Sequence, residues 1–287
     1  MDSKHDEMQP EEQSEMQACS RRSILAGSAA MLVGGALGGV MSAYAATNPK
    51  KAKKGASEAP PLPWKWVKLD PLEAGQRAYR NYFDGGCGHT TYYTLLSMLR
   101  EKAGYPWTTL PDRMMMHGAA GYAGHGTLCG ALGGTSLIIN LVAYKDAKDV
   151  MYTQLIDRLY YWYAKQEFPS TMFDDISSMP KQIRVKSLSP LCHTSVSKWT
   201  LAAGAQVTSK EKKERCAKVS GEVVYITVKA LNEYFDGKWT PPVWEPSKET
   251  AYCVTCHGPA DMQHAKEGMN QQQGHMECLL CHDDHTK

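Results

Sequence analysis

Two copies of a five-residue motif near the C-terminus carry the residue types needed for covalent haem attachment. The first is Cys253-Val-Thr-Cys256-His257 and the second is Cys278-Leu-Leu-Cys281-His282. In C-x-x-C-H the two thiols bond to the haem vinyl groups, and the adjacent histidine binds the iron as its proximal ligand. We therefore expect two haem c groups, held through Cys253, Cys256, Cys278 and Cys281, with His257 and His282 as proximal ligands.

A zinc site is the alternative for the same cysteines. Two C-x-x-C pairs separated by 278 − 253 = 25 residues could supply four sulfur ligands to one zinc ion. Such a site does not need a histidine directly after each second cysteine, whereas haem attachment requires one. The tandem motif therefore favours haem.

Each haem iron also takes a second axial ligand or keeps an open position, and this choice separates an electron carrier from an enzyme. His275 lies three residues before Cys278, too close to reach the far side of that haem. We expect the sixth ligands among His193, His264 and His285. A structural or surface role is the alternative for each. Methionine ligation is another, although we expect the run 114–116 to pack in a helix.

Four further cysteines, Cys87, Cys129, Cys192 and Cys216, show no C-x-x-C pairing. Two disulfides are one interpretation, since an oxidising compartment allows them. Four buried thiols are another, because free cysteine packs as a small hydrophobic residue. The third is an iron–sulfur cluster bound across several helices. Spacing alone does not distinguish these, nor a two-iron from a four-iron cluster. We assign one 2Fe–2S cluster to these cysteines.

The N-terminus, residues 1–45, has the features of a twin-arginine signal peptide. Arg21 and Arg22 precede a Gly- and Ala-rich apolar stretch that ends at Ala43-Tyr44-Ala45, so cleavage after Ala45 would leave 287 − 45 = 242 residues. An uncleaved anchor is the alternative, because about twenty apolar residues span a bilayer. The glycine and alanine content makes a poor anchor, and we expect no stable membrane attachment.

The export route bears on the four cysteines. Twin-arginine export carries folded proteins, whereas c-type haem is attached after export, in the periplasm. Haem alone therefore does not explain the signal, but a cluster inserted in the cytoplasm does. We expect a periplasmic protein that leaves the cytoplasm with its cluster in place.

The remaining chain must position these residues, and its pattern is mainly α-helical. The sequence predicts a flexible leader over residues 46–66 and a helical bundle domain over residues 67–236. Apolar spacing predicts helices over 90–102, 129–144, 147–168 and 210–235. Residues 237–287 contain prolines and little apolar material, so we expect a short dihaem-binding segment with little regular structure, whose core the haems supply.

The order of the four cysteines resembles a known redox-active family named for its C, GCAxxG, C, C pattern. Cys129 lies in Gly126-Thr-Leu-Cys129-Gly-Ala-Leu-Gly133, with Cys87 before it and the other two after it. Leu128 departs from the pattern, which has glycine there, but that position is not a ligand. Together with two C-x-x-C-H motifs, the chain resembles the split-Soret cytochrome c family from about Tyr79 to His282. The resemblance implies a homodimer with closely stacked haems, an iron–sulfur centre in the helical domain and a periplasmic location.

These observations favour an electron carrier that exchanges electrons with periplasmic redox partner proteins. The alternative is an oxidoreductase that reduces peroxide or a nitrogen oxide at an open haem iron. A redox sensor is a third class, but it usually carries an output domain. The formal net charge of +2 gives no indication of nucleic-acid binding. Because about forty residues leave much of two porphyrins uncovered, we expect dimerisation through the haem segment.

Overall fold

The computed structural model describes residues 59–258 and 273–286, and these are mainly α-helical with very little sheet. This confirms the expected fold class. The helices are α3 (Pro71–Ala103), α4 (Gly130–Ala143), α5 (Met151–Lys165), α6 (Cys192–Ala203), α7 (Lys210–Phe235) and α8 (Lys248–His257). The 3₁₀ turns are η1 (Trp107–Thr109), η2 (Met116–Gly118), η3 (Asp174–Ile176) and η4 (Cys278–Leu280), and strands β1 (Glu167–Phe168) and β2 (Val185–Lys186) pair antiparallel.

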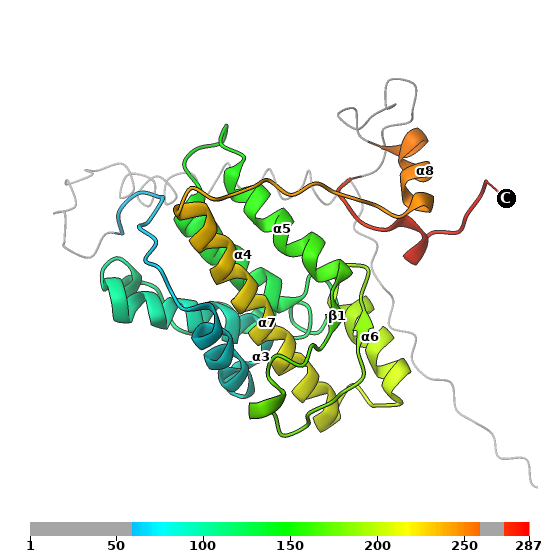
Figure 1. The fold of residues 1–287 in the computed structure, drawn as a ribbon, viewed down its shortest axis with the longest axis horizontal. Coiled ribbons are helices and arrows are strands. Elements are labelled where there is room, and N and C mark those ends of the chain that lie inside the picture. Colours follow the sequence, from blue (N-terminus) through cyan, green and yellow to red (C-terminus); the bar gives the residue numbers. More distant parts are fainter. Residues whose placement is uncertain (1–58, 259–272, 287) are drawn as a thin grey trace, which may run out of the picture. The chain divides into compact units, whose positions relative to one another are not determined.

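Helix α3 begins well before the segment that its apolar pattern predicts (Figure 1). The Asp70 side chain accepts a hydrogen bond from the backbone of Glu73, and proline at the start of the helix is suited to its first turn. Gly86 has a φ of 76°, so α3 consists of two helical parts joined by a kink. The kink lies one residue before Cys87, whose Sγ atom lies 3.8 Å from the Gly118 carbonyl oxygen.

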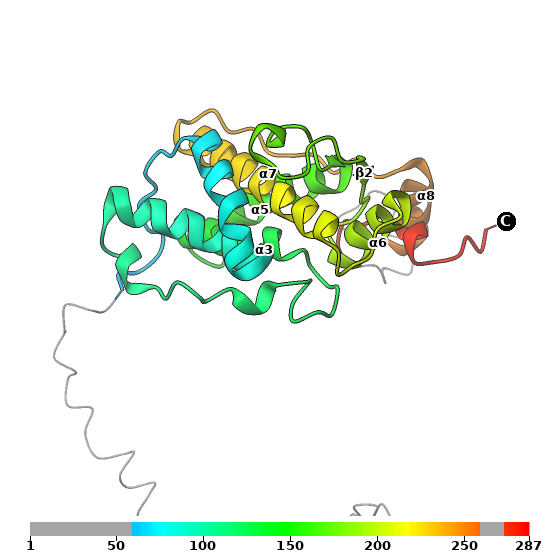
Figure 2. The same cartoon turned by 90° about the horizontal axis from the view of Figure 1, so that it is seen from below.

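Helix α7 packs along α3 and makes the most extensive helix pair in the described structure (Figure 2). The two backbones approach closely where Gly75 faces Gly221. A Cβ atom added to Gly75 would lie 3.0 Å from the Gly221 carbonyl oxygen, and one added to Gly221 would lie 2.8 Å from the Gly75 carbonyl oxygen. Glycine at both positions therefore sets this helix spacing. The bounds of α7 agree with the predicted helix over 210–235.

Helices α4 and α5 complete the main core. Helix α4 is buried over most of its length, as its glycine and alanine content predicts, and packs on both α3 and α7. Helix α5 is shorter than its predicted range of 147–168 and buries Leu155, Leu159 and Tyr163. The methionine run lies in turns before α4 instead of a helix. Only Met115 of that run is buried, whereas Met114 is 40% exposed.

The end of the expected flexible leader proves to be part of the core. Trp64 and Trp66 are 5% and 7% exposed, and the Trp64 ring meets the Trp107 ring edge to face at 5.0 Å. The Trp64 backbone N–H also donates to the Leu141 carbonyl oxygen on α4. The predicted boundary at residue 66 is therefore too late. Two tryptophans bury too much apolar area to remain in solvent.

Beyond α7 the chain has few regular elements, as its composition predicts. An extended segment leads to α8, and η4 is the last element of the described residues. Within residues 59–258 and 273–286, no helix combines the length and the apolar character that crossing a membrane requires. The predicted signal peptide and His264 lie outside the described residues.

Candidate haem and iron centres

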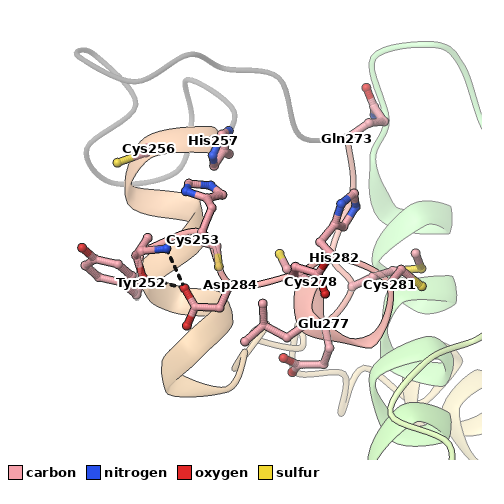
Figure 3. A pocket seen from close by; sticks show the side chains of 15 residues that line it. Tyr252, Cys253, Cys256, His257, Gln273, Glu277, Cys278, Cys281, His282 and Asp284 are labelled. Atoms are coloured by element: carbon pink, nitrogen blue, oxygen red, sulfur yellow. Dashed lines mark hydrogen bonds between the residues drawn. The ribbon is translucent and has the colours of Figure 1, made fainter.

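The two C-x-x-C-H motifs line one pocket with a volume of about 560 Å³ (Figure 3). This size lies in the range of cofactor and ligand sites. Cys253, Cys256 and His257 come from the last turns of α8, where i,i+3 spacing places the two thiols on neighbouring positions of one helix face. The second motif begins with η4. All six residues of the predicted haem attachment belong to this lining: Cys253, Cys256, His257, Cys278, Cys281 and His282.

A carboxylate clamp fixes the second motif against the helix that carries the first. Glu277 accepts hydrogen bonds from the Ser247 hydroxyl at 2.6 Å, the Ser247 backbone N–H at 3.0 Å and the Thr250 hydroxyl at 2.6 Å. The Cys278 backbone N–H in turn donates to Thr250 Oγ1 at 3.0 Å. Burial alone would raise the pKa of Glu277, but these donors lower it overall, so the clamp is ionised at neutral pH. Sequence reasoning did not identify this residue.

The haem segment also contacts the helical bundle directly. The Tyr161 hydroxyl on α5 and His275 Nδ1 lie 2.6 Å apart, and the Trp244 ring stacks on the same imidazole at 4.7 Å. Lys165 at the end of α5 pairs with Glu245 at 2.8 Å. His275 therefore has a structural role in the described residues, in agreement with its exclusion as a ligand of the adjacent haem.

The donor set of this pocket fits haem. All four thiols are free, and Cys256 and Cys281 are exposed at the pocket. Cys253 and Cys278 are half-buried, and burial together with the neighbouring Cys253 thiol raises the pKa of Cys278. Two thiols and one imidazole from each motif are the groups that thioether attachment and proximal ligation require.

A second cluster of thiols lies inside the helical bundle. Cys87 follows the kink of α3, Cys129 caps the N-terminus of α4, Cys192 begins α6 and Cys216 lies on α7. Each is free, and none is more than half-exposed. Cys129, Cys87 and Cys216 all act electrostatically on Cys192, so the four side chains converge on one region of the interior.

Local backbone pairing brings the segments of Cys129 and Cys192 together. Leu128 and Leu191 form an antiparallel bridge, in which the Cys129 N–H donates to the Pro190 carbonyl oxygen and the Cys192 N–H donates to the Thr127 carbonyl oxygen. These bonds measure 2.9 and 2.7 Å. Two cysteines that are 63 residues apart (192 − 129) are thereby fixed on adjacent backbone segments.

Glycines also allow the Cys87 side chain to lie close to the start of α4, which carries Cys129. A Cβ atom on Gly130 would lie 2.1 Å from the Gly118 carbonyl oxygen and 2.8 Å from the Cys87 sulfur. Gly130 occupies the position of the alanine in the GCAxxG pattern, so this chain uses a smaller residue where the cysteine packs. Gly121 has a φ of 70°, and a Cβ atom added there would lie 2.7 Å from Cys192 Cβ.

Burial is the main influence on the pKa values of three of these thiols, Cys87, Cys129 and Cys192. It raises the pKa of Cys87 to about 12, and it raises the pKa values of Cys129 and Cys192, with the neighbouring cysteines adding to the effect for Cys87 and Cys192. Buried thiols of this kind are protonated and unreactive at neutral pH. Metal binding reverses this state, since the ligand is the thiolate and a bound cation supplies the compensating charge.

The four thiols lie in one region, but their positions do not match those of ligands to a single metal ion. Among residues 59–258 and 273–286, no group of three or more His, Cys, Asp or Glu side chains is within reach of one ion. The donor chemistry nevertheless suits an iron–sulfur cluster, because four free thiols converge in a water-poor site. The disulfide alternative is not realised at any of these four cysteines.

The predicted sixth ligands lie in different places. His285 lines the haem pocket, and its ring centroid is 5.7 Å from that of His257. His193 is exposed beside Cys192, and its backbone N–H donates to the Gly126 carbonyl oxygen. It is absent from the lining of the haem pocket.

Two residues beside the buried thiols were not identified from the sequence. Arg215 is 2% exposed, and its Nη1 atom lies 3.8 Å from Cys216 Sγ. Tyr82 lies next to three of the thiols, and burial, with Cys216 next in importance, raises its pKa. The sequence contains a signal for Arg215, since it stands four and eight residues before the apolar Val219 and Val223 and so faces the core.

Comparison with known proteins first identifies the class of the helical domain. Residues 92–230 match the family model described as "Putative redox-active protein (C_GCAxxG_C_C)". The match includes Cys129, Cys192 and Cys216, and Cys87 lies five residues before it (92 − 87). The chain thus contains a helical domain of the C_GCAxxG_C_C class, with three of its four bundle cysteines inside the match.

The particular family follows from longer matches. Split-Soret cytochrome c of Desulfovibrio desulfuricans (strain ATCC 27774 / DSM 6949 / MB) is 30% identical over 278 residues, which cover 91% of this chain and 94% of that protein. A solved structure described as "A novel iron centre in the split-Soret cytochrome c from Desulfovibrio desulfuricans ATCC 27774" matches with a TM-score of 0.66 and 28% identity, covering 77% of this chain and 90% of the other. The chain belongs to the split-Soret cytochrome c family.

Proposed function

We propose that the chain is a periplasmic electron carrier with two haem c groups and one 2Fe–2S cluster. The observation that carries this proposal is the presence of two separate redox-type donor sets in one chain. Both C-x-x-C-H motifs line one pocket, and four free thiols gather inside the bundle. A relative described as having a novel iron centre supports the second set.

In the haem segment the chain supplies attachment, ligation and shielding. Cys253, Cys256, Cys278 and Cys281 would form the thioether bonds to two haems, and His257 and His282 would each bind one haem iron. Bound haem supplies reversible one-electron chemistry. Met276 and Leu279 line the pocket and would keep water from the porphyrin, and the clamp of Glu277 holds the second motif in position.

His285 is our first choice for the sixth ligand of the haem at His257. The two rings are nearly perpendicular, at 84°, with centroids 5.7 Å apart. Both imidazoles line the same pocket, so the two side chains could together hold one haem iron. His264 and His193 remain the candidates for the other haem.

Bis-histidine ligation predicts a carrier instead of an enzyme. Carbon monoxide added to the reduced protein, and cyanide added to the oxidised protein, bind rapidly only to an iron with an open position. We expect neither ligand to change the haem absorption spectrum within minutes at neutral pH. Rapid stoichiometric binding of either would instead favour the alternative, an oxidoreductase acting on peroxide or a nitrogen oxide.

We also propose that the carrier is a homodimer joined through the haem segment and exported by the twin-arginine route. The pocket is formed by a segment with few apolar residues, and large apolar faces such as porphyrins favour burial in an interface. Light scattering of the haem-loaded protein at micromolar concentration should give the mass of two chains. A monomer mass would contradict the dimer, and export that survives replacement of Arg21 and Arg22 by lysine would contradict the route.

A further inference from the structure

Arg215 is a buried cation that has no carboxylate partner among residues 59–258 and 273–286. Its Nη2 atom donates to Ser195 Oγ at 2.7 Å and to the Ser195 carbonyl oxygen at 3.3 Å, and its guanidinium carbon lies 5.9 Å from the centre of the Phe168 ring. Its Nη1 atom also lies 3.8 Å from Cys216 Sγ. These partners are neutral when Cys216 is a thiol.

The other buried charges of α7 are differently placed. Lys218 is 0% exposed and pairs with Asp174 at 2.6 Å. Glu214 accepts hydrogen bonds from Tyr79 and Ser177. Arg215 forms no ion pair with any carboxylate of the described residues.

Glu222 is the carboxyl group whose charge Arg215 influences, and it is a weak counter-ion. It accepts a hydrogen bond from the Ser170 backbone N–H at 2.8 Å, and burial raises its pKa to about 7. Burial therefore disfavours the charged form of this carboxyl group, which makes it a poor counter-ion. Arg215 itself keeps its proton under all ordinary conditions.

An isolated buried charge is costly, so a guanidinium in this position calls for negative charge nearby. The four thiols can supply it, because ligation to iron converts each of them to a thiolate. Four thiolates outweigh the positive charge of an iron–sulfur core, and each electron that the cluster accepts adds a further negative charge. The side chain that needs an anion therefore stands beside the site that becomes anionic.

We propose that Arg215 donates a hydrogen bond to the Cys216 thiolate of the iron–sulfur cluster and raises the reduction potential of that cluster. This inference rests on the proposed function, because it requires the cluster. Hydrogen bonds to the ligand sulfurs and net charge are the main protein influences on such potentials. A cation stabilises the reduced, more negative state more than the oxidised state, which gives the direction of the effect.

The test compares anaerobically purified, haem-loaded wild-type protein with Arg215→Gln and Arg215→Lys. Glutamine removes the charge, whereas lysine keeps it without the planar fork that fits two acceptors at once. An EPR-monitored redox titration measures the cluster potential, and visible absorbance in the same titration measures the haem potentials. Arg158→Gln is the matched control, since Arg158 is a partly exposed guanidinium that pairs with Glu233 on α7.

Arg215→Gln should change the oxidised-to-reduced ratio of the cluster at least tenfold at fixed solution potential, a lowering of 59 mV for a one-electron couple. Arg215→Lys should lie between this variant and the wild type. The haem potentials in all variants, and the cluster potential in Arg158→Gln, should stay unchanged. A wild-type cluster potential in Arg215→Gln overturns the proposal, as does an equal shift of cluster and haem potentials, which would indicate a general structural effect.

A second measurement does not depend on the folding of any variant. Wild-type protein labelled with ¹⁵N-arginine and reduced at the cluster should show nitrogen hyperfine coupling by electron–nuclear double resonance. Absence of that coupling overturns the hydrogen bond. A wild-type protein without acid-labile sulfide overturns the proposed cluster as well, whereas a cluster with neither coupling nor potential shift overturns the role of Arg215 alone.

Discussion

Replacing Asp174 by alanine should destabilise the protein by about 3 to 5 kcal/mol at pH 7, because it leaves the Lys218 ammonium group buried and unpaired. The Lys218 side chain is 0% exposed, and its Nζ atom lies 2.6 Å from Asp174 Oδ1 and 2.8 Å from the Met179 carbonyl oxygen. The pair ties α7 to η3, in the loop that leads to Cys192. Loss of stability should therefore accompany weaker retention of the cluster.

The free energy of deprotonating Lys218 limits how much stability the Asp174→Ala substitution can remove. An ammonium group escapes burial by deprotonation, which for an ordinary lysine at pH 7 costs about 4.6 kcal/mol (3.4 units at 1.36 each). The hydrogen bond to the Met179 carbonyl oxygen, worth about 1.5 to 3 kcal/mol to a charged donor, reduces the loss when the proton stays.

Denaturant unfolding followed by far-UV circular dichroism measures this change. Asp175→Ala is the control, because Asp175 is an exposed neighbour on the same turn and its loss should cost under about 0.5 kcal/mol. A loss below about 1 kcal/mol for Asp174→Ala would refute the assignment of a stabilising buried pair.

Three further predictions concern single side chains. Burial raises the pKa of Glu222 to about 7, above the value of an unfolded carboxyl group, so the folded protein binds more protons and loses stability as pH rises from about 4.5 through 7. Glu222→Gln should flatten this profile of melting temperature against pH, and an unchanged slope would contradict the shift. Cys129→Ser should remove non-haem iron and lower the melting temperature while the haem spectrum persists; full iron content in this variant would exclude Cys129 as a ligand. His257→Ala and His282→Ala should each abolish the normal spectrum of one haem and leave the other, so loss of both haems or of neither counts against proximal ligation.

The sequence predicts the helices whose apolar spacing is regular and fails where that spacing is absent. Helix α7 was predicted with its observed bounds because its apolar residues repeat on one face. The first half of α3 was not, since residues 75–86 contain glycines and few apolar residues, and the burial of Gly75 depends on its close approach to Gly221. That approach is a property of the packed helix pair and leaves no periodic signal.

The site residues were likewise predictable where local spacing defines them, and less so where tertiary contacts bring them together. The C-x-x-C-H residues were predicted from local spacing, which the chemistry of haem attachment dictates. The four bundle cysteines were predicted from residue type and resemblance, but their convergence depends on the bridge between Leu128 and Leu191 and on contacts of Gly118, Gly121 and Gly130. Arg215 and Glu277 were missed because their partners are distant in sequence, twenty residues away for Ser195 and thirty for Ser247.

The most direct test of two haems and one iron–sulfur cluster in one chain is a count of cofactors in anaerobically purified protein. Intact-mass spectrometry gives the number of covalent haems, and total iron with acid-labile sulfide gives the cluster on the same sample. We predict the mass of the mature chain plus two haems, with two non-haem irons and two sulfides per chain. Haem iron without sulfide, or a mass gain other than two haems, would contradict this account.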